Sequence, residues 1–206
     1  KENLQSDLDK VNEWSNKWLL KLNIQKCKVM SYGRDCRINS DYYLCCNDTR
    51  YNLEKLDSIN DLGVIFDKNL KFDSHIDKKV NKAYSILGLI NRNFRNMNLK
   101  SFVLIYKSMV RSHVEYANSV WSPYKIMDIE KIEKVQKRAT KMINSIKNLS
   151  YENRLRMLNL PTLKYRRLRG DMIEVYKIIT EKYDTNSAVN MNICTNSYTR
   201  GNRYKM

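Results

Sequence analysis

The sequence predicts an α+β fold that is predominantly helical, and three observations lead to this prediction. Only five Gly and two Pro occur in 206 residues, which favours long helices with few tight turns. From residue 74 onwards apolar residues recur at spacings of three and four, the period of a helix. Before that point short apolar runs stand between polar turn signals, which is typical of strands. The hydrophobic content of 42% is enough to bury a core.

The first 73 residues are predicted to form one helix followed by short strands. Residues 3–20 form an amphipathic pattern, and its apolar positions are Leu4, Leu8, Val11, Trp14 and Trp18. Both tryptophans are expected to pack in a core or against a neighbouring sheet, with stacking on nucleic-acid bases as the weaker alternative. Strands are expected at 22–24 and 29–30 with a break near Lys26, and at 42–46 and 51–53 around the turn signal Asn47-Asp48.

Another strand is predicted at residues 62–66, where Leu-Gly-Val-Ile-Phe forms a compact apolar run. The polar residues 67–69 are expected to turn the chain, so that residues 70–72 return as a second strand. Gly63 is interpreted as a position where another backbone approaches the strand closely.

The second part of the chain is predicted to be a helical domain over residues 74–183, followed by a polar, flexible tail over residues 184–206. Asp73 and Ser74 are candidate N-caps of its first helix. Further helices are expected at 99–120, 128–146, 151–158 and 161–182. Pro123 marks the end of the helix at 99–120, because proline cannot continue the backbone hydrogen-bond ladder. The domain boundary is therefore placed after residue 73.

The net charge of +16 is unevenly distributed along the chain. Residues 1–73 hold twelve Lys/Arg and twelve Asp/Glu, so the remaining 26 basic and ten acidic residues lie in residues 74–206. This excess predicts a surface for a polyanion, of which nucleic acid is the commonest. A solubility surface and a face for anionic membranes are the alternatives.

Basic residues are concentrated on two of the predicted helices. At about 100° per residue, the helix at 128–146 has its apolar positions on one arc and its cations mainly on the opposite arc. These cations are Lys131, Lys134, Lys137, Arg138 and Lys141. The last helix opens with Lys164, Arg166, Arg167 and Arg169, and Arg154 and Arg156 precede it. Cations near a helix N-terminus are unfavourable, so we expect a partner such as phosphate to offset them, with a solvated face as the alternative.

Residues for metal or nucleophilic chemistry are sparse. The five cysteines form no C-x-x-C pair and His75 and His113 are isolated, so neither a metal site nor a disulfide framework is expected. Cys27, between two lysines, is interpreted as a small buried side chain.

Because the sequence shows neither a membrane span nor a signal peptide, we expect an intracellular protein without a membrane partner. The sequence contains no Asp-Asp dipeptide.

Four segments, taken in order, resemble the carboxyl-terminal part of the reverse transcriptases of LINE-like, non-LTR (jockey-type) retrotransposons. The segments are LQSDLDKVNEWSNKWLLKLNIQKCKVMSYG, INDLGVIFDKNLKFDSHIDKKVNKAYSILGLINRNF, SFVLIYKSMVRSHVEYANSVWSPYKIMDIEKIEKVQKRATKMI and LSYENRLRMLNLPTLKYRRLRGDMIEVYKII. They cover roughly residues 4–179. The closing TRGNRYKM is similar to the terminal segment of that family, with Asn202 in place of the family's histidine.

The resemblance implies a partial right-hand polymerase, in which the end of a palm (a helix and short antiparallel strands) precedes an α-helical thumb bundle. The parent activity would be RNA-directed DNA synthesis, with catalytic aspartates in a hairpin just before the helix that opens this chain and two metal ions at that hairpin. Because this sequence has no Asp-Asp pair, we do not expect it to polymerise alone. No cofactor is expected in this chain, and Mg²⁺ is expected only in the intact polymerase.

The resemblance also implies roles for single residues and partners. Lys26 matches a motif lysine near the incoming nucleotide and is the candidate proton donor to pyrophosphate. Leu62, Gly63 and Val64 match the strands that grip the primer end, and the helices from residue 74 match the thumb along the primer–template backbone. The implied partners are RNA, DNA and the missing N-terminal polymerase region, in a nuclear or cytoplasmic ribonucleoprotein. The alternative is a stand-alone basic helical module that binds nucleic acid or a protein without a polymerase role.

Overall fold

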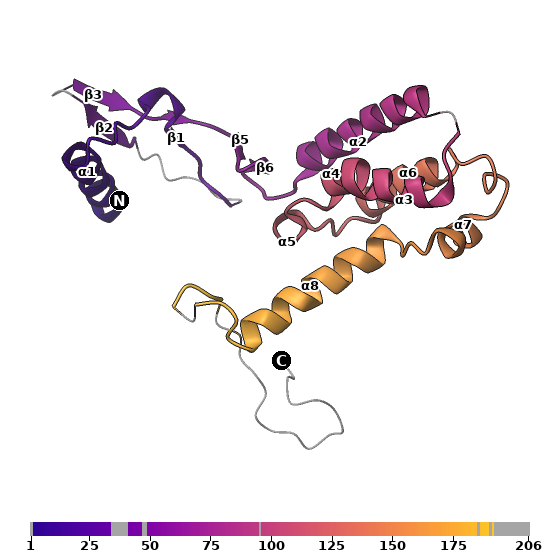
Figure 1. Cartoon of the computed structure of the whole chain (residues 1–206). Coiled ribbons are helices and arrows are strands. Elements are labelled where there is room, and N and C mark those ends of the chain that lie inside the picture. Colours follow the sequence, from indigo (N-terminus) through magenta and orange to yellow (C-terminus); the bar gives the residue numbers. More distant parts are fainter. Residues whose placement is uncertain are drawn as a thin grey trace, which may run out of the picture. The chain divides into compact units, whose positions relative to one another are not determined.

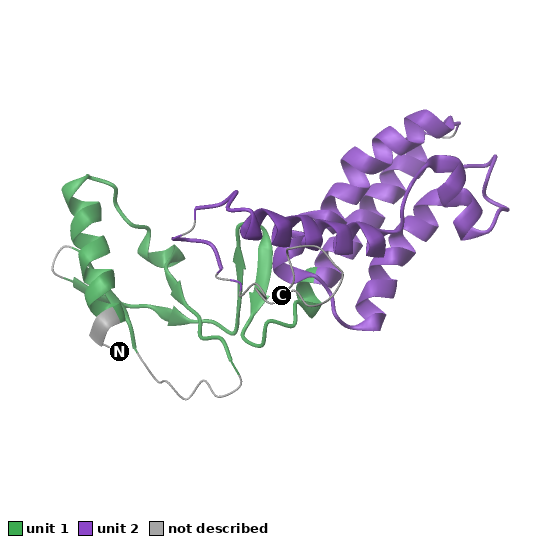
Figure 2. Ribbon diagram, turned by 90° about the horizontal axis from the view of Figure 1, so that it is seen from below, with its two compact units in different colours: residues 1–75 green, residues 76–206 purple. Residues whose placement is uncertain are grey.

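The computed structural model describes residues 2–33, 41–46, 49–94, 96–184, 186–189 and 191 (Figure 1). The chain divides into two compact units, residues 1–75 and residues 76–206 (Figure 2). Helices predominate and the strands are short, so the prediction of a predominantly helical α+β fold is confirmed. No helix within the described ranges has both the length and the apolar character needed to cross a membrane.

The first unit combines one long helix with short strands. Its elements are α1 (Glu2–Lys17), the 3₁₀ helix η1 (Ile24–Lys26), β1 (Lys28–Val29), β2 (Tyr43–Cys46), β3 (Thr49–Asn52), β4 (Glu54–Lys55), β5 (Ser58–Asp61) and β6 (Val64–Asp67). The strands pair two by two: β1 runs parallel to β4, β2 is antiparallel to β3, and β5 is antiparallel to β6. The turn signal at residues 47–48 and most of the tail predicted at 184–206 lie outside the described residues.

Helix α1 is joined to β2 by side-chain amides. The Gln5 amide makes two hydrogen bonds with Tyr43, donating from Nε2 to the carbonyl oxygen (3.1 Å) and accepting at Oε1 from the backbone N–H (3.2 Å). Asn12 Nδ2 donates to the carbonyl oxygen of Cys45 at 2.6 Å. Trp14, on the other side of α1, is 55% exposed, and Trp18, just after the helix, is 61% exposed, so neither tryptophan belongs to the core of this unit.

The stretch between α1 and β1 contains a turn where a strand was predicted. Residues 24–26 form η1, and the Asn23 side chain accepts a hydrogen bond from the Lys26 backbone N–H at 3.3 Å. The strand predicted at 22–24 is therefore wrong, because a capping asparagine favours a local turn over a ladder. The break predicted near Lys26 is confirmed. Cys27 is half-buried, not fully buried, and its thiol donates to the carbonyl oxygen of Asn23 at 3.3 Å.

The strand that pairs with β6 precedes it in the sequence, whereas the prediction placed the partner strand after it. Residue Asp61 faces Val64, so Leu62 and Gly63 form a two-residue loop, with φ of 44° and 81°. Two positive φ values are the signature of a type I′ turn, whose twist matches that of the strands. The strand partner of β6 therefore precedes it, and the returning strand predicted at 70–72 is wrong.

The segment after β6 is folded around one carboxylate. Asp67 accepts hydrogen bonds from the backbone N–H groups of Asn69 (3.0 Å), Lys71 (3.1 Å) and Phe72 (2.7 Å). Burial alone would raise the pKa of Asp67, but these three bonds and the Lys71 charge outweigh it, and the pKa is lowered from 3.8. The Phe72 ring then packs edge-on against Phe66 in β6, with ring centroids 5.7 Å apart.

We predict that this turn loses stability in acid. Because the folded-state pKa of Asp67 is depressed, its stabilising effect is present above the unfolded-state pKa and disappears as the pH falls through the folded-state pKa. The amide resonances of Lys71 and Phe72 should shift with a midpoint below 3.8. Asp67→Asn should abolish that titration and lower the unfolding free energy at neutral pH, whereas Asp57→Asn, at a carboxylate 86% exposed, should do neither.

The second unit is helical. The helices, including α2, which begins just before the division between the units, are α2 (Asp73–Asn93), α3 (Leu99–Ile105), the π-helix η2 (Tyr106–Arg111), α4 (Ser112–Glu115), α5 (Asn118–Trp121), α6 (Ile126–Thr140), α7 (Tyr151–Leu158) and α8 (Leu163–Ile179). Its fully buried apolar residues come from almost every helix and include Val80, Ala83, Phe102, Tyr106, Val110, Val114, Trp121, Ile132, Val135, Ala139 and Leu163. These residues form the core that holds the basic helices in place.

Two predicted helices break or end well before their expected ends. The helix expected at 99–120 passes through the π-helix η2 and breaks at Ala117, which has φ of 52°. The helix expected at 128–146 ends at Thr140. Its last apolar residues, Ile143 and Ile146, are nevertheless buried at 4% and 3% exposure, because they reach the core from turns. An apolar spacing alone does not distinguish such turns from a helix.

Candidate nucleic-acid interface

Helix α6 and its C-cap residue, Lys141, carry a stripe of cations. Lys134, Lys137, Arg138 and Lys141 follow one another at intervals of three, one and three residues, and all four are exposed. Residues at these spacings share one side of a helix. The other side is buried through Ile132, Val135 and Ala139, each at 1% exposure or less. We call these four residues the α6 stripe.

Helices α2 and α6 are tied together beside this stripe. Lys131 makes an ion pair with Asp77 of α2, and the Arg138 guanidinium lies 5.3 Å from the centre of the Tyr84 ring, also in α2. Asp77 and Tyr84 are seven residues apart on α2, and their partners Lys131 and Arg138 are seven residues apart on α6. Equal spacing in the same direction indicates that the two helices run parallel over two turns. Lys131 is thus engaged within the protein, while Arg138 keeps its exposed position on the stripe.

The N-terminus of α8 is capped by a residue of α6. Glu133 accepts hydrogen bonds from the backbone N–H groups of Leu163 (3.4 Å) and Lys164 (3.2 Å), and Thr162 accepts one from Tyr165 (3.1 Å). A carboxylate at this position satisfies unpaired N–H groups and interacts favourably with the helix dipole. The unfavourable effect of cations at the start of α8 is therefore offset in part by an internal partner, Glu133, which the sequence did not reveal.

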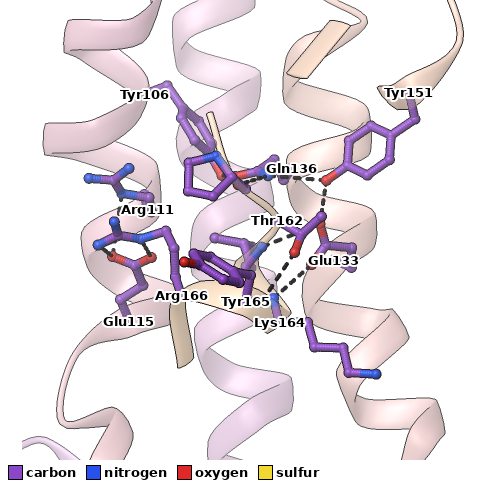
Figure 3. Close-up of polar contacts among 12 residues, drawn as sticks. Tyr106, Arg111, Glu115, Glu133, Gln136, Tyr151, Thr162, Lys164, Tyr165 and Arg166 are labelled. Carbon is purple, nitrogen blue, oxygen red and sulfur yellow. Dashed lines mark hydrogen bonds and ion pairs between the residues drawn. The ribbon is translucent and has the colours of Figure 1, made fainter. Parts of the chain in front are cut away.

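A buried amide next to Glu133 connects α6 with three other segments (Figure 3). Gln136, with no exposed surface, accepts a hydrogen bond from the Tyr106 hydroxyl (2.7 Å) and donates to the Tyr151 hydroxyl (3.1 Å) and the Pro161 carbonyl (3.0 Å). The Tyr151 hydroxyl in turn donates to Glu133. Burial and the neighbouring Glu133 carboxylate raise the pKa of Tyr151 well above its ordinary value, so the hydroxyl remains a hydrogen-bond donor.

The arginines of α8 are divided between surface and interior. The Arg166 guanidinium makes a two-point contact with Glu115 of α4, with Nη2 3.0 Å from Oε2, and Arg111 Nε lies 3.3 Å from the same Glu115 oxygen (Figure 3). The hydrogen bonds to Glu115 raise the pKa of Arg166 despite its partial burial. Arg167 is buried at 5% exposure, and burial lowers its pKa.

The basic residues predicted to bind nucleic acid therefore differ in their exposure to solvent. The α6 stripe is exposed, as are Lys164 and Arg169 at the start of α8, and these six side chains can reach a phosphate backbone. Lys131, Arg166 and Arg167 are held by internal contacts or by burial. Arg154 is also turned inward, where its Nε donates to Thr140 Oγ1 (3.0 Å) and its Nη1 to the Leu149 carbonyl (2.7 Å).

The helical unit contains a further basic cluster that the sequence reading missed. Burial lowers the pKa of His113 in α4, and the charges of Lys79 and Lys82 of α2 lower it further. The Lys79 ammonium lies 5.0 Å from the centre of the Tyr116 ring. Lys79 and Lys82 are three residues apart on α2, and this helical spacing was the available signal.

The predicted site residues of the first unit lie at two separate turns. Lys26 ends η1 with an exposed side chain. Leu62 lies at the tip of the β5–β6 hairpin with 84% of its surface exposed, Gly63 follows it in the turn, and Val64 is buried at 3%. Among the described residues, no three His, Cys, Asp or Glu side chains are grouped so as to hold a metal ion.

Comparison with known proteins gives a distant relationship. The chain is similar to the RNA-directed DNA polymerase from the mobile element jockey of Drosophila funebris, with 27% identity over 195 residues that cover 88% of this chain and 19% of the polymerase. This chain has a reverse-transcriptase-like sequence. It is also similar to an uncharacterized protein of Caenorhabditis elegans, with 25% identity over 128 residues that cover 61% of this chain and 65% of that protein.

The chain thus spans about a fifth of the jockey polymerase and less than two thirds of the nematode protein. No protein-family model matches the sequence, and no solved structure does.

We predict that Gln136 is essential to the stability of the helical unit. Gln136→Ala removes the partner of the buried Tyr106 hydroxyl and of the Pro161 carbonyl, so the unfolding free energy should fall by about 3 kcal/mol. Urea unfolding followed by the fluorescence of Trp121, which is buried at 1% exposure, measures this. Lys134→Ala, on the exposed side of α6, is the matched control and should change stability by less than about 0.5 kcal/mol. An equal effect of the two substitutions would contradict the prediction.

Proposed function

We propose that this chain is part of a retrotransposon reverse transcriptase and that its helical unit binds the backbone of a primer–template duplex. The observation that carries this proposal is the α6 stripe, four exposed cations on one side of a helix whose other side is core. Lysine and arginine side chains bind phosphates without base specificity, which suits an enzyme that must move along any sequence. The similarity to a polymerase from a mobile element supports the same function.

In this proposal the chain is organised as the end of a palm over residues 1–73, a thumb-like domain over residues 74–183 and a tail over residues 184–206. The β5–β6 hairpin would grip the primer end. Leu62 combines a left-handed backbone conformation with an 84% exposed side chain, an arrangement that costs about 1–2 kcal/mol for a residue with a side chain. The type I′ turn requires this conformation but favours Asn or Gly at its first position, so a leucine that accepts the cost supports a role for its exposed side chain. The buried Val64 anchors the tip.

The missing N-terminal polymerase region is the proposed protein partner of the first unit. Helix α1 and the residue that follows it expose four apolar side chains at helical spacing: Leu4, Val11, Trp14 and, just after the helix, Trp18, each at least 50% exposed. An apolar stripe of this size on a helix that already packs against β2 on its other side indicates a second interface. Cover by the rest of a polymerase palm would bury both tryptophans.

Catalysis would depend on that same missing region. Metal-assisted nucleotide transfer requires carboxylates that hold two metal ions, and this sequence contains no Asp-Asp pair. We therefore propose that Mg²⁺ binds only in the intact polymerase and that Lys26, exposed at the end of η1, serves as proton donor only there.

Salt dependence tests the binding mode. We expect the chain to shift a primer–template duplex in gels, with an affinity that falls steeply as salt rises. Alanine at the four positions of the α6 stripe should reduce the slope of log affinity against log salt by about 3–4, because each phosphate neutralised contributes about 0.9. A variant with Lys10, Lys17, Lys21 and Lys68 replaced by alanine has the same net charge and should keep the slope. Equal slopes for the two variants would exclude the stripe as the site.

A primer-extension assay tests the division between binding and catalysis. The purified chain, incubated with primer–template, nucleotides and Mg²⁺, should bind the duplex without extending the primer, because the metal-binding aspartates are missing. Reproducible extension, absent from a mock preparation made with the same vector, would refute this part of the proposal.

A second candidate function is a stand-alone basic helical module that binds nucleic acid or a protein without a polymerase role. The observation that favours it is the core of the helical unit, which includes Trp121, Phe102 and Ile132, each at 1% exposure. Gel shifts distinguish the two candidates. A polymerase fragment should prefer a recessed primer–template end over a blunt duplex of equal length, whereas a backbone-binding module should bind both equally.

A further inference from the structure

A groove of about 430 Å³ lies between α3 and the end of α7. None of its lining residues belongs to the α6 stripe. Its lining is apolar and basic. The apolar lining includes Leu99, Val103, Leu104 and Met157, which we call the floor, and the basic lining consists of Lys100 and Lys107, which we call the rim. None of the residues that line the groove is acidic.

The floor of the groove is open to solvent. Leu104 is 70% exposed and Met157 is 58% exposed, whereas Phe102 and Tyr106 on α3 and η2 are buried at 1% each. Leu104 lies two residues from each of these core positions, and on a helix that spacing places it on the opposite side. A second hollow of about 330 Å³ continues from Leu104 towards Phe94 and Met97. The apolar surface therefore extends to both sides of Leu104.

The charge of the rim is not balanced by the chain itself. Lys100 precedes Leu104 by four residues and Lys107 follows it by three, so both lysines lie on the same side of the helix as Leu104. Neither lysine makes an ion pair with any residue in the part of the chain that the structure describes. A ligand with negative charge and an apolar side would match both features at once.

We propose that this groove binds an acidic amphipathic helix of a protein partner. Apolar side chains of that helix lie against Leu104 and Met157, and its carboxylates pair with Lys100 and Lys107. Helices commonly bind grooves in this way, with apolar anchors at spacings of three and four residues, and a methionine in the floor adapts to different anchors. A nucleic-acid backbone fits less well, because its phosphates would pair with the lysines but leave Leu104 and Met157 against polar sugar and phosphate.

Fluorescence anisotropy with defined peptides tests the proposal on the full chain. The probe is a labelled helical peptide with Leu at positions i, i+3, i+4 and i+7 and Glu on its flanks. The matched peptide has Lys in place of every Glu. The wild-type chain should bind the acidic peptide at least tenfold more tightly than the basic one.

Substitutions in the groove locate the binding. Leu104→Asn should weaken binding of the acidic peptide at least tenfold, and Leu168→Asn, at an α8 position 56% exposed, should leave it unchanged. The double charge reversal Lys100→Glu/Lys107→Glu should reverse the preference towards the basic peptide. The control reversal Lys147→Glu/Lys182→Glu, at exposed positions outside the groove, should not reverse it. Leu104→Asn should leave the affinity for the primer–template duplex unchanged, so this test is independent of the proposed polymerase function.

Three results would overturn the proposal. The first is equal binding of the two peptides by the wild-type chain, which would indicate nonspecific adsorption. The second is wild-type affinity of Leu104→Asn for the acidic peptide, which would place the binding elsewhere. The third is a loss of duplex affinity in Leu104→Asn together with displacement of the peptide by single-stranded RNA, which would make the groove a nucleic-acid site.

Discussion

The buried amide of Gln136 is the interaction on which the helical unit depends. Through three hydrogen bonds it joins α6 to η2, to α7 and to the chain that leads into α8, and its neighbour Glu133 caps α8. A fully satisfied polar network of this kind admits one arrangement of its helices, because any shift leaves a buried polar group without a partner. The directions of α6, α7 and α8, and therefore of their cations, follow from it.

The basic surface is formed as much by the placement of carboxylates as by that of cations. Glu115, Glu133 and Asp77 each bind an internal partner, namely Arg166, the N-terminus of α8 and Lys131. Acidic side chains that could neutralise a neighbouring cation are thereby held at helix junctions. The charges of the three exposed lysines and the one exposed arginine of the α6 stripe are then little compensated by the chain itself, and the electric field of such a surface attracts polyanions over several ångströms.

The sequence predicts this fold best where periodicity is strong and uninterrupted. The helix at 151–158 agrees with α7, and the alternation of core and cations on α6 is observed as predicted. Prediction failed where local backbone geometry decides the secondary structure. Leu62, for example, belongs to an apolar run that predicts a strand, but it adopts a turn conformation. It also failed where a residue's partner is distant in sequence: Arg166 contacts Glu115 across 51 residues, and no local pattern indicates which arginine of a cluster turns inward.

The contact between Gln5 and Tyr43 has a consequence for how the first unit behaves in solution. The N–H and C=O groups of Tyr43 that bind the Gln5 amide are those that another strand would use to pair with β2, since β3 already pairs with the opposite edge. Helix α1 thus blocks a sheet edge that would otherwise be open to strands from other chains. Gln5 and Asn12, which binds the Cys45 carbonyl, therefore protect this edge from pairing with other chains, and any process that detaches α1 would expose the edge beside two tryptophans that are already exposed.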